Sequence, residues 1–146
     1  MKIYRQSIWK ANSTRTRFIP LVISFLIVLL LIHQKLTFLL WAGGFILIFA
    51  LMMCTTYFYV IITNNSIIIK NSVFPFWKEE FGFSYVQKVE IGHTGGFTPD
   101  YLRVYTSSKK SRRYVIDLVS EKDYPNLIND LKNKGISAEK GITSRN

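Results

Sequence analysis

Two long apolar runs dominate the pattern of hydrophobic and polar positions along this chain. They extend over residues 18–32 and 36–62 and are separated only by His33, Gln34 and Lys35. Neither run contains an acidic or basic side chain, and neither has the polar stripe that a core helix of a water-soluble domain shows. The pattern therefore predicts a helical hairpin that lies in a membrane.

The first run is short for a membrane span, and this leaves two arrangements open. As a helix it covers about 22 Å, whereas the hydrocarbon core of a bilayer is about 30 Å thick. Thr14, a snorkelling Arg17 and Leu36 can extend it at its two ends. The alternative is a re-entrant hairpin that never reaches the far surface. We favour two full spans, in a predicted transmembrane hairpin over residues 18–56.

The segment before the hairpin, residues 1–17, carries basic but no acidic side chains. Its cations are Lys2, Arg5, Lys10, Arg15 and Arg17. Because cytoplasmic segments beside membrane spans are rich in lysine and arginine, this excess predicts a multi-pass protein with both termini in the cytoplasm and the helix–helix connection outside. The segment itself fits either a short amphipathic piece in the headgroup region or a solvated leader.

Beyond residue 56 the hydrophobic period changes to that of β-strands. Apolar and polar positions alternate in six short stretches, at residues 57–63, 66–70, 78–83, 86–91, 101–107 and 113–119. Asn64 and Asn65, between the first two stretches, tolerate positive φ and predict a tight turn. This number and spacing of strands are typical of a barrel or sandwich.

One amphipathic helix follows the predicted strands. Its apolar residues, which recur at spacings of three and four, are Tyr124, Leu127, Ile128 and Leu131. Gly135 is suited to end the helix. Residues 57–136 are therefore predicted to form one α+β domain, and residues 137–146 an unstructured polar tail.

Four segments, taken in order, carry a resemblance to a known family. They are YVIITNNSIIIKNS, KEEFGFSYVQKVEI, RRYVIDL and EKDYPNLINDLKNKG. Their hydrophobic spacing resembles that of the pleckstrin-homology-like (PH-like) domain, and the chain is similar to bacterial membrane proteins that join a two-helix hairpin directly to such a domain. The resemblance covers most of residues 15–136. It implies a small antiparallel β-barrel of six or seven strands capped by a C-terminal helix, in a bacterial inner (plasma) membrane, without catalysis.

The net charge of +10 changes this picture little once it is mapped along the chain. Residues 64–146 carry 13 basic and nine acidic side chains, a net charge of +4, so more than half of the excess lies beside the hairpin. Such a distribution determines membrane topology and does not indicate a nucleic-acid partner. Cys54 is the only cysteine, which excludes an intrachain disulfide and suits a reducing compartment.

Catalytic and metal-binding patterns are missing from the sequence. The two histidines, His33 and His93, are far apart, and Cys54 lies in an apolar run, so they suggest no zinc ligand set. Glu79 and Glu80 are neighbours on a predicted strand and point to opposite faces, so they do not form an acid–base pair. We therefore expect no enzymatic activity, no cofactor and no metal.

The loop around Pro75 is a candidate contact site for membrane or protein. It carries three large apolar side chains, Phe74, Phe76 and Trp77. A contiguous apolar patch at an exposed turn needs a partner, although some of these side chains could instead fold under the domain as core. If successive strands reverse direction, this loop returns to the membrane surface from which the first strand starts.

The turn before the last predicted strand is the main basic cluster of the domain. Its cations are Lys109, Lys110, Arg112 and Arg113. They could attract an anionic leaflet, but a solvated, charged turn is the interpretation that we favour. The reversal of strands places this turn roughly 15 Å farther from the membrane, beyond the screening length of about 8 Å at physiological salt. The polar loop at residues 93–100 fits either a partner contact or plain turn chemistry.

The sequence therefore favours a non-enzymatic membrane-anchored module that binds or assembles with other molecules. We expect membrane lipids as partners, together with another protein or further copies of the chain. The alternative is an accessory subunit whose helices pack into a larger membrane enzyme or transporter.

Overall fold

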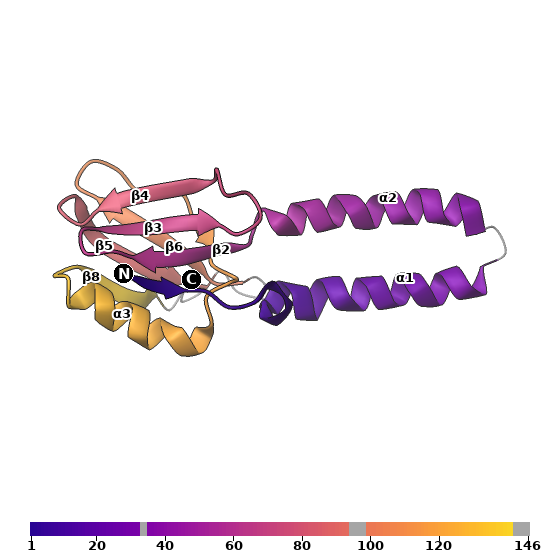
Figure 1. Ribbon diagram of the computed structural model, residues 1–146, viewed down its shortest axis with the longest axis horizontal. Helices are drawn as coiled ribbons and strands as arrows, with labels where there is room; N and C mark the ends of the chain where they lie inside the picture. Colours follow the sequence, from indigo (N-terminus) through magenta and orange to yellow (C-terminus); the bar gives the residue numbers. More distant parts are fainter. Residues whose placement is uncertain (33–34, 94–98, 142–146) are drawn as a thin grey trace, which may run out of the picture.

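The computed structural model describes residues 1–32, 35–93 and 99–141, and it separates into a helical hairpin and a sheet-rich domain (Figure 1). The two helices extend from one end of the domain. Strands from both ends of the chain pair with strands from its middle within the domain. The predicted order of two apolar helices followed by an α+β domain is confirmed.

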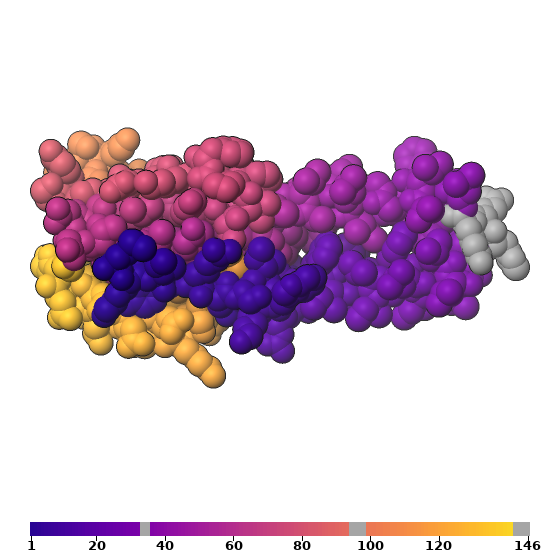
Figure 2. All heavy atoms as spheres, in the orientation of Figure 1, coloured from indigo at the N-terminus to yellow at the C-terminus, as the bar shows by residue number. Residues whose placement is uncertain are grey.

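The hairpin consists of two helices with very few charged side chains. The first begins with a π-helical turn, η2 (Thr14–Phe18), and continues as α1 (Ile19–Leu31), where Pro20 is tolerated because it lies in the first turn. The second is α2 (Lys35–Cys54). Both are long and apolar enough to cross a membrane. Most of their apolar side chains are exposed on the surface of the molecule (Figure 2).

Two four-stranded sheets make up most of the domain. The first is antiparallel, in the order β1 (Lys2–Tyr4), β2 (Phe58–Ile62), β3 (Ser66–Asn71) and β4 (Lys78–Gly82). The second runs in the order β7 (Tyr114–Val115), β6 (Tyr101–Thr106), β5 (Val86–Gly92) and β8 (Ser137–Gly141), with β8 parallel to β5. The other elements are η1 (Ile8–Lys10), η3 (Glu121–Asp123) and α3 (Tyr124–Lys132).

The two sheets and α3 share one hydrophobic core. Alternate strand residues point inward, as Val60 and Ile62 of β2 do. Leu127 and Leu131 of α3 are fully buried against the sheets. The predicted apolar face of this helix is therefore confirmed.

The sheets are not closed into a barrel, so the closed shape that the family resemblance implies is not confirmed. Among the described residues, the β-pairing that links the two sheets is one isolated antiparallel bridge, from Tyr57 just before β2 to Ile116 just after β7. The last predicted strand is also shorter than expected, with β7 covering two residues. Just beyond β7, the N–H of Leu118 donates to the carbonyl of Phe58 in β2, so the chain passes here from the second sheet to the first.

The N-terminal segment corrects the prediction of an amphipathic or solvated leader. Its first residues form β1, in which Lys2 pairs with Ile62 and Tyr4 with Val60. Tyr4 is buried, and its hydroxyl donates to the carboxylate of Asp130 on α3. Burial and this carboxylate together raise the pKa of Tyr4. A three-residue strand is too short to show a period in the sequence, which is why the pattern missed it.

The predicted polar tail also contains a strand. β8 pairs along β5 from Ser137 opposite Lys88 to Gly141 opposite Gly92, and it buries Ala138. Its other side chains are polar or absent, so the sequence shows no alternation of apolar residues. Residues 142–146 of the predicted tail lie outside the described residues.

Candidate functional site

A second, smaller hydrophobic cluster joins the hairpin to the domain. Its buried residues are Ala11, Met53, Tyr57, Tyr59 and Leu118. They come from the segment before η2, from the end of α2, from the start of the first sheet and from the chain beyond β7. The helices therefore contact the domain through a packed apolar cluster and not only through the chain that connects them.

Asp117 is the central polar residue of this junction. Its carboxylate accepts hydrogen bonds from the N–H groups of Asn12, at 3.1 Å, and Ser13, at 3.3 Å, and from the Ser13 hydroxyl. These N–H groups belong to the first two residues of the helical run that continues through η2 into α1, so Asp117 caps that helix from a distant part of the chain. Burial raises the pKa of Asp117, whereas the hydrogen bonds from Ser13 and Asn12 and the charge of Arg17 oppose this shift.

Further hydrogen bonds hold both helices to the first sheet. The hydroxyl groups of Thr14 and Tyr57 are 2.7 Å apart and bonded to each other. At the end of the second helix, the side-chain amide of Asn71 donates to the carbonyl of Cys54 at 3.0 Å. The junction therefore fixes both helices through polar as well as apolar contacts.

The aromatic loop, Phe74 to Trp77, lies at the end of the domain from which the helices leave (Figure 1). The carbonyl of Tyr57, just beyond α2, accepts from the N–H of Ser72 at the start of this loop. Ring centroids of Phe74, Phe76 and Trp77 are 5.1–6.0 Å apart. Phe76 is 74% exposed, so this ring does not fold under the domain as core.

The predicted basic turn does not form one cluster of cations. Lys110 lies over the Tyr105 ring, while Arg112 lies over the Tyr114 ring and forms an ion pair with Glu79 at 3.3 Å. Lys110 therefore contacts the second sheet, and Arg112 contacts both sheets. The same holds for Arg113, which lies over the Tyr101 ring, while Lys109 is in the turn that closes β6.

The five cations before the hairpin are divided between the domain and its junction. Lys2 forms an ion pair with Asp130 at 2.6 Å. Arg5 lies over the Tyr59 ring and donates to the Ser72 hydroxyl at 2.8 Å. The remaining three, Lys10, Arg15 and Arg17, lie beside the start of the first helix.

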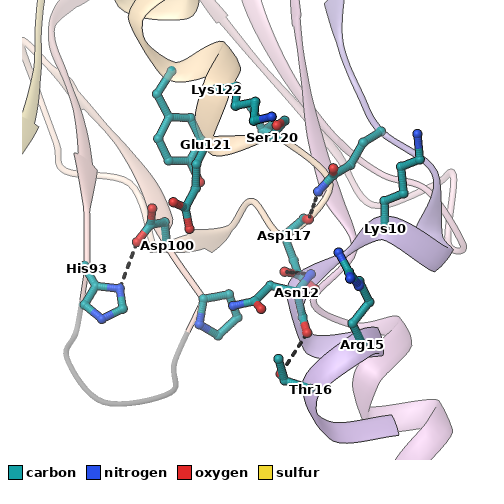
Figure 3. A pocket seen from close by; sticks show the side chains of 14 residues that line it. Lys10, Asn12, Arg15, Thr16, His93, Asp100, Asp117, Ser120, Glu121 and Lys122 are labelled. Atoms are coloured by element: carbon teal, nitrogen blue, oxygen red, sulfur yellow. Dashed lines mark hydrogen bonds and ion pairs between the residues drawn. The ribbon is translucent and has the colours of Figure 1, made fainter. Parts of the chain in front are cut away.

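A cleft of about 520 Å³ opens at this junction (Figure 3). Its lining includes Lys10 and Arg15 from the N-terminal segment and Asp100, Asp117 and Glu121 from the domain. A ring nitrogen of His93 contacts the Asp100 carboxylate at 2.8 Å, so the structure brings together two residues of the predicted polar loop. Thr94 and Thr98 of that loop lie outside the described residues.

The sequence did not predict this cleft. Its two walls are more than 75 residues apart along the chain. One wall is a segment with a few cations before an apolar run, and the other is a polar loop together with the start of a helix. Neither segment by itself has a pattern that indicates a binding site. The excess of cations before the apolar run indicated membrane topology instead. A signal in the sequence would have been Asp117, an acidic residue inside the apolar segment that precedes the last helix.

Within residues 1–32, 35–93 and 99–141, no group of three histidine, cysteine, aspartate or glutamate side chains is arranged to hold a metal ion. No family model matches the chain, and no curated protein matches it either. The geometry of the junction, the aromatic loop and the cleft is therefore the basis for assigning a function.

Proposed function

We propose that this chain is a non-enzymatic binding or assembly module, of the PH-like kind, that two transmembrane helices hold at the cytoplasmic face of a bacterial inner membrane. The observation that carries the proposal is the combination of exposed apolar helices with a packed junction. Leu30, Leu31 and Trp41 are 76–80% exposed, and a surface of this kind requires lipid or other helices around it. The junction then keeps the domain against the membrane.

The orientation follows from the charges next to the first helix. Lys10, Arg15 and Arg17 lie on the domain side of the hairpin, and no acidic residue precedes the helix in the sequence. Such an excess of cations favours the cytoplasmic side of a membrane. The domain and both termini are accordingly cytoplasmic in this proposal.

The aromatic loop provides a second contact with the bilayer. Aromatic side chains with large exposed surface are favoured at the membrane interface. The loop between β3 and β4, which carries the exposed Phe76 and Trp77, lies at the helix end of the domain and therefore reaches the headgroup region in this proposal.

The contacts of the acidic side chains at the junction agree with a binding role rather than a catalytic one. Asp117 caps a helix, and the Asp100 carboxylate contacts His93 and helps to raise the pKa of the buried Tyr124 hydroxyl. These carboxylates maintain the structure, whereas a general acid or base must reach a substrate proton.

An accessory subunit of a larger membrane complex is the second candidate. The observation that favours it is the open face of α2 at Gly44, where a Cβ atom would meet nothing within 4 Å in the described structure. A helix from another chain could approach closely at such a position. Stoichiometric co-purification with one membrane enzyme or transporter would favour this candidate over the first.

Cysteine accessibility in intact cells tests the proposed topology. In a Cys54→Ser background, a membrane-impermeant thiol reagent should label Gln34→Cys in the helix–helix connection but not Ser107→Cys in the domain. Extraction with alkaline carbonate should leave the protein in the membrane fraction. Labelling of Ser107→Cys would contradict the cytoplasmic orientation, and release by carbonate would contradict membrane integration.

A further inference from the structure

The cleft at the junction has opposite charges on its two sides (Figure 3). Asp100, directly before β6, and Glu121, in η3, lie on the side of the domain. Lys10 and Arg15 lie on the other side, on the segment that leads into the first helix. The lining thus separates an acidic from a basic region across one opening.

The acidic side concentrates negative charge around the Tyr124 hydroxyl. Burial is the main cause of the raised pKa of Tyr124, and the Asp100 and Glu121 carboxylates raise it further. Asp100 already contacts His93. Glu121 is exposed and forms no ion pair with any described residue, although Lys122 is its neighbour and also lines the cleft. A ligand cation placed here would meet one free and one bonded carboxylate.

The basic side offers donors that the protein itself does not use. Lys10 and Arg15 are exposed, and neither forms an ion pair within the described part of the chain. Other polar groups of this wall are engaged, since the Thr16 hydroxyl donates to the carbonyl of Asn12 at 2.8 Å. Asp117 lies between the two sides, but its carboxylate is bonded to Ser13 and Asn12. A phosphate at this wall would therefore find two unpaired cations.

We propose that the cleft binds a zwitterionic headgroup that carries a phosphate and a primary ammonium, as phosphoethanolamine does. The guanidinium of Arg15 and the ammonium of Lys10 bind the phosphate, because both form charge-assisted hydrogen bonds with its oxygens. The ligand ammonium donates to Glu121 and Asp100. A cleft of about 520 Å³ lies within the usual range for small-molecule sites.

The pattern of charges distinguishes this headgroup from others of similar size. A choline headgroup has no N–H donor, so it would desolvate the carboxylates without a hydrogen bond in return. An anionic glycerol headgroup has no cation to place beside Glu121 and Asp100, and their charges would oppose it. The site therefore selects for the primary ammonium as well as for the phosphate.

The position of the cleft favours a lipid as the source of this headgroup. Arg15 and Thr16 belong to the first turn of the helical run that continues into α1, at the end of the domain that faces the membrane in the proposed function. The inference rests on that function for this choice of source. The same chemistry is present in free phosphoethanolamine, so the experiment must separate the two.

Calorimetric titration of the full-length protein in dodecyl maltoside micelles tests the proposal. The probes are short-chain phosphatidylethanolamine, phosphatidylcholine and phosphatidylglycerol, together with free phosphoethanolamine. We expect phosphatidylethanolamine to bind about tenfold more tightly than the other two lipids. Binding of the lipid but not of the free compound supports a membrane ligand, whereas equal binding of both supports the headgroup as a soluble ligand of the same site.

Charge-removing variants assign the binding to the two sides of the cleft. Arg15→Gln should weaken all phosphate ligands about fivefold, the factor that corresponds to about 1 kcal/mol per cation. Glu121→Gln should weaken phosphatidylethanolamine alone and thereby abolish most of the preference. Lys109→Gln and Glu139→Gln make the same charge changes away from the cleft and should leave the affinities unchanged. Thermal unfolding of each variant checks that it is folded.

Equal affinity for the three lipids would overturn the proposal, and so would an equal loss in the cleft variants and the control variants. These results leave the proposed function intact if carbonate extraction still retains the wild-type protein in membranes. Release of the wild-type protein by carbonate would instead contradict the proposed function, whatever the lipid preference in micelles.

Discussion

At the residue scale, the carboxylate of Asp117 accepts hydrogen bonds from backbone groups that lie 104 and 105 positions earlier in the sequence. The sequence shows Asp117 as one acidic residue between Ile116 and Leu118, and the pattern predicted a strand there. Nothing local identifies Asn12 and Ser13 as its partners. The capping role depends on the chain turning after β7, and this turn follows from tertiary packing rather than from local propensity.

The raised pKa of Asp117 predicts a specific pH dependence of stability. Because the folded protein holds this proton more tightly than the unfolded chain, the contribution of Asp117 to the free energy of unfolding falls as pH rises from 3.8 through its raised pKa. Asp117→Asn removes this contribution. The melting temperature of Asp117→Asn should therefore rise relative to wild type as pH increases over this interval, in detergent-solubilised protein.

Asp117→Ala provides the control for the hydrogen bonds themselves. The alanine leaves the N–H groups of Asn12 and Ser13 without their acceptor, whereas the asparagine retains one oxygen. The alanine variant should be less stable than the asparagine variant by about 1–3 kcal/mol. A difference between wild type and Asp117→Asn that does not change with pH would contradict the assigned pKa shift.

At the scale of elements, the strength of the hydrophobic period determined what the sequence could predict. α3 was predicted because its apolar positions repeat over more than two turns, and Gly135, at φ 78°, lies just beyond its end as expected. β1 and β8 were missed because they are short or polar and are stabilised by pairing with β2 and β5. Their strand character comes from the neighbouring strand, which a pattern within one segment does not reveal.

The burial of α3 predicts the cost of truncating its apolar side chains. Leu127→Ala should lower the free energy of unfolding by about 2–5 kcal/mol, because Leu127 is fully buried against the sheets. Ile128→Ala is the matched control, since Ile128 on the same helix is only half-buried and should cost less. Limited proteolysis and thermal unfolding measure both. Equal resistance of Leu127→Ala and wild type would contradict the packing of this helix.

At the scale of the whole molecule, the alternating direction of the strands predicted which loops lie at the hairpin end of the domain. It did not predict the cleft. The aromatic loop returns to the helix end, and the turn at Tyr85, whose N–H donates to the carbonyl of Gly82, lies between β4 and β5 at the other end. This follows from reversal at each turn and needs no knowledge of side-chain contacts. The cleft requires the N-terminal segment to lie against the domain, which the sequence did not indicate.

Fluorescence quenching by brominated lipids can locate the aromatic loop relative to the bilayer. In full-length protein with Trp9→Phe and Trp41→Phe, Trp77 is the only tryptophan. If the loop lies at the membrane surface, lipids brominated on the acyl chains near the headgroup should quench Trp77 strongly in nanodiscs. The physical reason is that the loop between β3 and β4, which carries Trp77 and the exposed Phe76, lies at the end of the domain from which α2 leaves.

The turn between β4 and β5 supplies the matched control for this experiment. Tyr85 is 67% exposed and belongs to this turn, which lies at the opposite end of the domain. Tyr85→Trp, combined with Trp77→Phe in the same background, therefore places the only tryptophan away from the membrane. This variant should show little quenching by the same lipids. Equal quenching at both positions would mean that the domain lies on its side, and stronger quenching at position 85 would reverse the proposed orientation. Because the junction is packed and hydrogen-bonded, we expect the difference between the two positions to persist when the lipid composition is changed.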